Sequence, residues 1–253
     1  MNHEENKLVT IFLVALTVAI VIMSLLLVYI VYIKPRTIVV QVSSPGDKGK
    51  DYLKNDIYTY LLIEIDYVPG YAPDNDALSL LIQRITFYTN KTIKDKVLNA
   101  ELENRDKYTI EEVYELEKKH RNYYTANDVA VLYFIYLSGE FADEKNVLGV
   151  AYTGTSIVVF KETIKKAATV YLPVRDIESA VLVHEFGHII GLVNINYKSD
   201  RNHEDTAHKY HCINPKCVMY YEVESRKLSI IFTGLPTDFD DNCRKDIEKL
   251  KSS

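Results

Sequence analysis

The segment HEFGHIIGLVN, residues 184–194, contains two histidines four positions apart and a glutamate beside the first. On an α-helix, residues four apart lie on one face, so His184 and His188 can direct ring nitrogens toward one metal ion. Glu185 lies one position further round the helix, where it can reach a water bound to that ion and take its proton. This spacing predicts a zinc site in which His184 and His188 are ligands and Glu185 is the general base of a hydrolytic reaction.

A chance match on an ordinary helix is the alternative, and three features argue against it. The helix is otherwise strongly apolar, so burying two histidines and a glutamate without partners would cost free energy. Gly191, three residues past the second histidine, can end the helix in a left-handed conformation and turn the chain back toward the metal. Five of the seven histidines also fall between His184 and His211.

A catalytic zinc needs a third protein ligand. Asn194 stands where one common pattern has that ligand. Four residues further along are chemically able to bind the metal, and the residues alone leave the choice among them open. These are His203, Asp205, His208 and His211. Those that do not bind would be solvated loop residues or partners that orient the ligand rings.

The three cysteines, Cys212, Cys217 and Cys243, all lie in the last quarter of the chain. Three cysteines are few and cannot all be paired, which argues against a disulfide scaffold. Metal binding, buried free thiols and a Cys212–Cys217 disulfide all remain open.

This region resembles the metzincin clan of zinc peptidases and, within it, the archaemetzincin group. The clan pattern is HExxHxxGxxH or D, followed by a methionine turn beneath the zinc. The archaemetzincin version continues as HC, four residues, CxM and, later, a CxxC that helps to bind a second zinc. The matching residues are His184, Glu185, His188, Gly191, His211, Cys212, Cys217, Val218 and Met219.

The chain departs from the family by an insertion, NINYKSDRNHEDTAHKY, between the two halves of the motif. The resemblance implies that this segment is a loop, after which His211 returns to fill the third ligand position. Such an insertion is thermodynamically tolerable because the entropy cost of closing a loop grows slowly with its length. Met219 would pack in the turn under the metal without being a ligand.

The resemblance also implies a second, structural zinc bound by Cys212, Cys217 and Cys243. The position of the family's fourth cysteine holds Asp246. We expect Asp240 or Asp241 to complete this site, although three cysteines and an aspartate are a rarer set of zinc ligands.

Residues 8–33 form an uncharged apolar run between Lys7 and Lys34. The run is long enough to span a bilayer. It is too long for the apolar part of a signal peptide and lacks a small-residue cleavage site. We therefore predict a short tail at 1–7, one uncleaved transmembrane helix at 8–33 and a zinc metallopeptidase-like domain at 34–253. The lysines and arginines that follow the span favour a cytoplasmic domain on a single-pass membrane protein.

The pattern within the domain predicts alternating strands and helices. We expect a short strand at 37–42, a hinge at 43–51 and strands at 58–68 and 128–137. Residues 147–160 are expected to form a strand pair or one long edge strand broken at Gly154. Helices are expected at 76–90 and 101–123, and an active-site helix from Pro173 to Gly191. These elements form an α/β (α+β) domain of metzincin-like fold, with a mixed sheet. The resemblance implies that an edge strand within 149–160 pairs with an extended substrate.

The net charge of -5 and the pI near 5.8 give no reason to expect a nucleic-acid partner, which would bind to a basic face of the protein. The sequence therefore predicts a membrane-anchored zinc metallopeptidase that acts on a peptide or protein substrate, with the lipid bilayer as its other partner.

One alternative is a non-catalytic, membrane-tethered zinc-binding module, against which the retained Glu185 argues. Another is a peptidase that uses a downstream glutamate such as Glu204 as its ligand. That alternative conflicts with Gly191 and the CxM turn.

Overall fold

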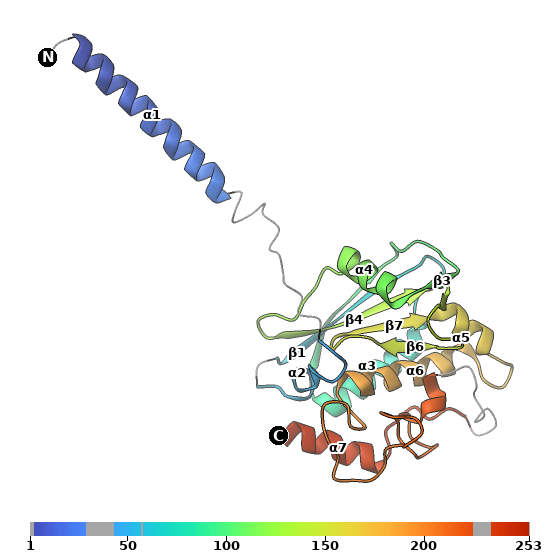
Figure 1. Cartoon of the computed structure of the whole chain (residues 1–253). Helices are drawn as coiled ribbons and strands as arrows, with labels where there is room; N and C mark the ends of the chain where they lie inside the picture. The colour runs from blue at the N-terminus through green and yellow to red at the C-terminus, as the bar shows by residue number, and fades with distance from the viewer. Residues whose placement is uncertain (1–2, 29–42, 57, 225–233, 253) are drawn as a thin grey trace. The chain divides into compact units, whose positions relative to one another are not determined.

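The computed structural model describes residues 3–28, 43–56, 58–224 and 234–252 (Figure 1). The chain divides into two compact units, Met1–Gln41 and Val42–Ser253. The first contains one helix, α1 (His3–Val28). The second contains the sheet and all the candidate site residues described below.

The membrane span predicted at 8–33 overlaps α1, but residues 29–33 lie outside the described part of the chain. Side chains within the predicted span are described only at 11–24. Within the described residues, no helix combines the length and the apolar character needed to cross a membrane. The predicted membrane anchor is therefore not supported.

The second unit is built on a five-stranded sheet in the order β2-β1-β4-β7-β6. These strands are β1 (Tyr60–Tyr67), β2 (Thr92–Asn99), β4 (Val129–Leu137), β6 (Gly149–Ala151) and β7 (Ser156–Phe160). The first four in that order are parallel, and β6 joins β7 antiparallel as the edge strand. β1 and β4 are buried almost throughout, as expected for parallel strands covered on both faces.

Helices cover both faces of the sheet (Figure 1). α3 (Asn75–Thr89) and α6 (Val174–Ile189) pack with Leu132 and Phe134 of β4 in the larger core. α4 (Ile110–His120) packs with Tyr133 and Ile135 in the smaller core on the opposite face. The alternation of side chains along β4 therefore serves two cores at once.

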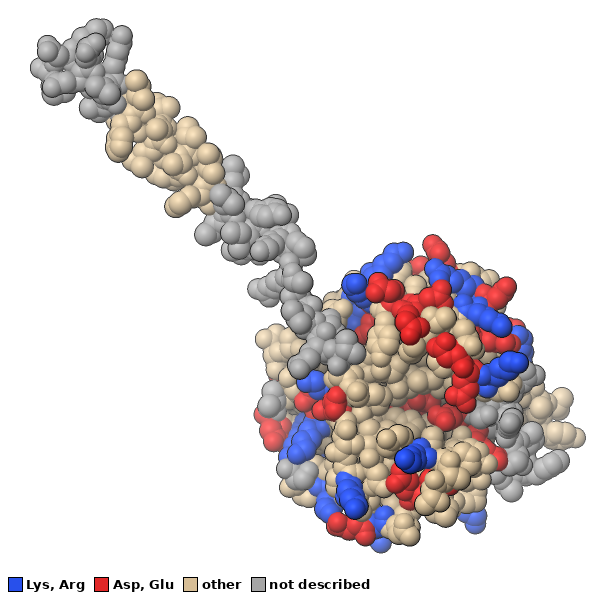
Figure 2. All heavy atoms as spheres, viewed as in Figure 1, with Lys and Arg blue, Asp and Glu red and all other residues tan. Residues whose placement is uncertain are grey.

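The remaining elements are short or lie near the end of the chain. They are α2 (Gly49–Leu53), β3 (Lys107–Tyr108), β5 (Glu140–Phe141), α5 (Lys161–Ala167), the 3₁₀ helix η2 (Tyr221–Glu224) and α7 (Asp241–Ser252). β3 and β5 form a separate two-stranded sheet. On the face of this unit shown in Figure 2, Lys and Arg side chains are interspersed with Asp and Glu side chains.

The predicted mixed α/β organisation is confirmed, and the sheet is mainly parallel. The strands predicted at 58–68, 128–137 and 147–160 are present as β1, β4 and the β6–β7 pair. The helix predicted at 101–123 shortens to α4, because Thr109 and Glu112 form a capping box that fixes its start. The strand predicted at 37–42 lies outside the described residues.

Candidate metal centre

Helix α6 carries His184, Glu185 and His188 into the core of the second unit. His184 and Glu185 are fully buried, and His188 is 7% exposed. The Nε2 atoms of the two histidines face each other at 3.0 Å. Two ligand nitrogens bound tetrahedrally to one zinc at 2.0–2.1 Å would lie about 3.3 Å apart. The two rings are therefore already spaced for a shared ion.

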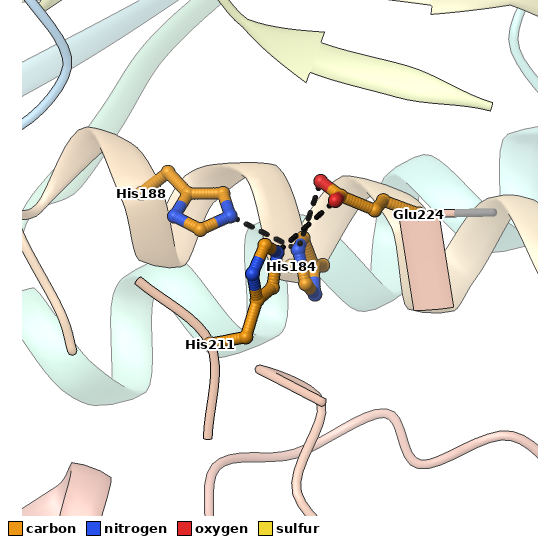
Figure 3. A group of neighbouring side chains, drawn as sticks. All are labelled: His184, His188, His211 and Glu224. Carbon is orange, nitrogen blue, oxygen red and sulfur yellow. Dashed lines mark hydrogen bonds and ion pairs between the residues drawn. The ribbon is translucent and has the colours of Figure 1, made fainter. Parts of the chain in front are cut away.

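The chain turns sharply where α6 ends. Gly191 follows the helix with φ +87°, a left-handed conformation in which a residue with a Cβ is strained. The chain then runs through the insertion and returns to the helix at His211. The His211 ring centroid lies 5.3 Å from that of His184 and 5.2 Å from that of His188. The structure thus brings His211 to the pair on α6 (Figure 3).

The other candidates for the third ligand lie in different surroundings. His208 contacts Asp205 at 2.8 Å and stacks on the ring of Tyr221. Asn194 is used within the loop, where its Nδ2 donates to Glu204 Oε2 at 2.6 Å. His203 is buried against Asp246 in a second cluster.

Glu224, which was not among the predicted ligands, joins the three histidines (Figure 3). Its Oε2 lies 3.5 Å from His184 Nε2, and its Oε1 lies 3.1 Å from His211 Nε2. Burial raises the pKa of Glu224, but its contacts with His184 and His211 outweigh burial and bring the pKa below its ordinary value. Glu224 follows Met219 in no recognised pattern, so only the fold reveals it.

Backbone contacts orient the His184 and His211 rings so that their Nε2 atoms, which lack a proton, point toward one position. The Nδ1 of His184 lies 2.6 Å from the Val218 carbonyl oxygen, and the Nδ1 of His211 lies 2.9 Å from the Lys209 carbonyl oxygen. Because a carbonyl only accepts, each Nδ1 carries the proton and each Nε2 presents a lone pair. Burial, with His184 and His211 next to it, holds the pKa of His188 well below its usual range. Three imidazoles whose ring nitrogens converge suit a cation.

Unpartnered buried atoms point to the same conclusion. His188 Nδ1, His211 Nε2 and Glu185 Oε1 are buried and make no hydrogen bond. His211 Nε2 is close to Glu224 but is not aligned for hydrogen bonding. Buried polar atoms rarely lack partners. The ligand atoms of the three histidines and Glu224 lie within 4.8 Å of one another, and imidazole and carboxylate are both zinc ligands. These residues fit a metal ion.

Met219 packs against helix α6 at Gly187. It is fully buried, and a Cβ added at Gly187, between His184 and His188 on α6, would collide with its sulfur. The absence of a side chain at Gly187 therefore lets the Val218–Met219 segment approach the helix closely. That approach brings the Val218 carbonyl to the His184 ring.

Glu185 lies between α6 and the edge strand β6. Its Oε2 accepts a hydrogen bond from the Ala151 backbone N–H at 2.7 Å. Gly149 makes this approach possible, since a Cβ there would lie 2.7 Å from Val181 and 3.2 Å from Glu185 Cγ. Burial and then Glu224 raise the pKa of Glu185 well above its ordinary value, against the lowering effect of the Ala151 N–H.

A pocket of about 450 Å³ opens beside these groups. Val150 and Ala151 of β6 line it together with Glu185, His188 and His211. A reactant in this pocket would contact the histidines, the glutamate and the edge strand at the same time.

The cysteines form a separate group. Cys212, Cys217 and Cys243 are all buried with free thiols. His203 and Asp240 lie with them, whereas the exposed Asp241 is paired with Arg244 on α7. The predicted cysteines therefore lie in one group of neighbouring side chains, which contains the expected Asp240 and also His203.

No protein-family model matches the chain, and no curated protein matches it in sequence. Solved structures similar to it include archaemetzincin from Methanopyrus kandleri, at 18% identity over 78% of this chain and 97% of the other, with a TM-score of 0.49. The chain is also similar to archaemetzincin from Archaeoglobus fulgidus, at 16% identity over 73% and 98% of the two chains, with a TM-score of 0.44. Metalloproteinase-II from Bacteroides fragilis is similar at 12% identity over 78% and 55%, with a TM-score of 0.42. At these identities and scores, the likeness carries no inference about activity.

Proposed function

We propose that the unit Val42–Ser253 is a zinc-dependent peptidase that hydrolyses peptide bonds in a peptide or protein substrate. One observation carries the proposal. His188 and His211, whose ring nitrogens converge with that of His184, line a pocket together with Glu185, one of whose carboxylate oxygens is buried and unpartnered. The proposal does not extend to the membrane anchor predicted at 8–33.

His184, His188 and His211 would hold the zinc, since three protein ligands are what a catalytic zinc site needs. When bound, zinc polarises a carbonyl and lowers the pKa of its water to about 7. The backbone carbonyls of Val218 and Lys209 fix two of the rings by accepting from Nδ1. The backbone on either side of His211 in the sequence thus orients two of the ligand rings.

Glu185 would be the general base. Its Oε2 is held by the Ala151 N–H, so Oε1 is left to take a proton. A buried carboxyl with a raised pKa holds a proton better than an exposed one, and can pass it on to the leaving amine. The same residue would therefore act first as base and then as acid.

The edge strand β6 would orient the substrate. In the described part of the chain it pairs with β7 alone, and its Val150 and Ala151 line the pocket. An extended peptide can add to such an edge through backbone hydrogen bonds. This arrangement would lay the scissile bond beside Glu185.

A closed, non-catalytic zinc site is the second candidate, and the position of Glu224 favours it. With Glu224 as a fourth ligand, three histidines and a carboxylate would leave no open position, as in structural zinc sites. The unpartnered Oε1 of Glu185 favours the peptidase, because a structural site has no use for a free buried carboxylate beside its ligands.

Glu185→Gln distinguishes these candidates. The full-length protein, loaded with zinc, is incubated with a mixture of peptides, and the products are identified by mass spectrometry. We expect the wild type to cleave peptides and Glu185→Gln to keep its zinc but lose about 10²–10⁴-fold in rate. The control is Glu111→Gln, at an exposed position on α4, which should behave as wild type. Zinc-loaded wild type that cleaves nothing would favour the closed site.

A further inference from the structure

The pocket beside Glu185 is lined in part by residues that the chemistry of the site does not use. They come from two segments that lie far apart in the sequence, the two ends of the insertion at 194–210 and the segment ahead of α2 at 43–48. These lining residues are Ser44, Pro45, Asn194, Ile195, Asn196 and Tyr210. Because none of them is a proposed zinc ligand or the proposed base, they would act on a substrate through contact alone.

Glu204, within the insertion, fastens the two ends of the insertion to each other. Its Oε1 accepts a hydrogen bond from the Tyr210 backbone N–H at 2.9 Å, and its Oε2 accepts from Asn194 Nδ2 at 2.6 Å. These two hydrogen bonds bring the pKa of Glu204 below its ordinary value, so the carboxylate is the form that makes them. The first and the last residue of the insertion are therefore held together at the pocket.

Asn196 fastens the insertion to the segment ahead of α2. Its Nδ2 donates to the Pro45 carbonyl at 3.2 Å and to Asp47 Oδ1 at 2.6 Å. The backbone N–H of Gly154, which follows the edge strand β6, donates to the Ser43 carbonyl at 2.9 Å. The segment ahead of α2 is therefore held both by the insertion and by the turn that follows the edge strand.

The backbone at both ends of the insertion is in the left-handed region. The φ angles are +54° at Val193, +67° at Asn194, +54° at Asn196 and +68° at Tyr210. Asparagine tolerates this conformation, but a β-branched or aromatic residue is strained in it. Strained residues persist only where the surrounding structure holds them, and they cluster at functional sites. The strain at Val193 and Tyr210 therefore points to a role for the conformation that the insertion takes at the pocket.

The lining residues offer apolar surface to a substrate. The side-chain amides of Asn194 and Asn196 are engaged with Glu204 and with the segment ahead of α2. Pro45 and Ile195 are half-buried, and the Tyr210 side chain is 48% exposed. None of the described residues that line the pocket is a lysine or an arginine, so an acidic side chain would find no cationic side chain there. A concave, mainly apolar surface with few free polar groups suits an apolar group.

We propose that the two ends of the insertion and the segment ahead of α2 form a subsite for a bulky apolar side chain of the substrate, an inference that rests on the proposed function. Pro45, Ile195 and Tyr210 would contact that side chain. Glu204 is a positioning residue, since it acts through Asn194 and Tyr210. The edge strand would hold the substrate backbone, and the subsite would select the side chain that lies near the cleaved bond.

The test measures peptide binding by zinc-loaded, full-length Glu185→Gln, in which the proposed base is removed. The probes are fluorescent peptides of glycine and alanine with one central residue, Leu, Asn or Ala, and affinity is read from fluorescence anisotropy. Leu and Asn are similar in shape and differ in polarity. We expect the Leu peptide to bind at least about tenfold more tightly than the Ala peptide, because it buries a larger apolar side chain. The Asn peptide should bind about as weakly as the Ala peptide.

Variants in the same Glu185→Gln background locate the subsite. Ile195→Ala should lower the ratio of Leu-peptide to Ala-peptide affinity toward one, and Pro45→Ala covers the case in which Ile195→Ala does not fold. Glu204→Gln keeps only one oxygen for two hydrogen bonds, so it should also lower the ratio. The matched control is Lys198→Ala, at an exposed position of the insertion that does not line the pocket, and it should leave the ratio unchanged.

The subsite is overturned if the Leu peptide binds no more tightly than the Asn and Ala peptides, or if Ile195→Ala and Pro45→Ala both leave the ratio unchanged. A ratio that changes in these two variants but not in Glu204→Gln would remove the positioning role of Glu204. If zinc-loaded wild type cleaves no peptide although the binding preference is present, the proposed function fails and the subsite stands. If wild type cleaves peptides without any binding preference for Leu, the subsite alone fails.

Discussion

His211 and Cys212 are neighbours in the chain, yet their side chains enter two different groups of metal-binding residues. His211 joins His184, His188 and Glu224, and Cys212 joins the cluster that contains His203. The Cys212 backbone N–H donates to the Met219 carbonyl at 2.7 Å, and the carbonyl of the preceding residue, Val218, contacts His184 Nδ1 at 2.6 Å. The geometry of one group therefore depends on the backbone of the other.

His211→Ala should lose the zinc at the α6 histidines and the peptidase activity together, because two protein ligands are too few for a catalytic site. Zinc content and hydrolysis are measured in a Cys212→Ser, Cys217→Ser, Cys243→Ser background, checked for folding by circular dichroism. His208→Ala is the matched control. Its ring contacts Asp205 and Tyr221 instead of the histidine group, so it should keep the zinc. If His211→Ala kept the zinc and His208→Ala lost it, His211 would not be a ligand of this site.

Glu224→Ala should keep the zinc and retain activity to within about 10–100-fold of wild type, the range typical of residues outside the ligand set. Glu224 lies close to His184 and His211, but three histidines suffice to hold the metal. Zinc affinity is measured by competition with a chelator. A loss of zinc as complete as that of His184→Ala would make Glu224 a true ligand and favour the closed site.

Gly187→Ala should destabilise the protein, since the added methyl group would collide with the Met219 sulfur and lie 3.0 Å from the Phe239 ring. Overpacking of this kind costs about 1–3 kcal/mol, which exceeds the gain of up to about 1 kcal/mol in helix propensity. Unfolding in urea gives the change in free energy. Met219→Ala should relieve the collision that Gly187→Ala creates. The double variant should therefore lose less free energy of unfolding than the sum of the losses of the two single variants. Strict additivity would contradict the contact.

In the metal-free protein, Asp246 should stabilise the fold more at pH 6 than at pH 9. Hydrogen bonds with Asp246 and then Cys212 raise the pKa of His203 to about 9. A histidine whose pKa is raised on folding stabilises the folded state below its unfolded pKa, about 6.5, and this stability is lost as pH rises through the folded pKa. Urea unfolding of wild type and Asp246→Asn is compared at both pH values after chelation. If the difference in unfolding free energy between wild type and Asp246→Asn is the same at pH 6 and pH 9, the His203–Asp246 pairing is contradicted.

The elements that bear the histidines were predictable because their signals are local. The i, i+4 spacing of His184 and His188, Pro173 before the helix and Gly191 after it together predict α6. The continuous apolar runs of β1 and β4 are equally local signals. In contrast, β2 (TIKDKVLN) is a largely exposed, charged strand, and its pairing with β1 is not visible in its own residues.

The parts of the site that the sequence could not predict depend on the path of the insertion. His203 was a candidate for the first metal, and only the fold brings it to the cysteines. Asp246 stands in the sequence where the family pattern has a cysteine. In the structure it contacts His203. Glu224 comes to the histidines through η2, which has no distinctive pattern. Long-range contacts of this kind have no signature in the spacing of residues.

The most direct test of the central claim is the anomalous scattering of zinc-loaded crystals at the zinc absorption edge. We expect a peak at about 2.0–2.1 Å from the Nε2 atoms of His184, His188 and His211, with a position on the Glu185 side free of protein atoms. A map with no peak among these histidines, or one in which a Glu224 oxygen binds the zinc and closes that position, would contradict a catalytic zinc site.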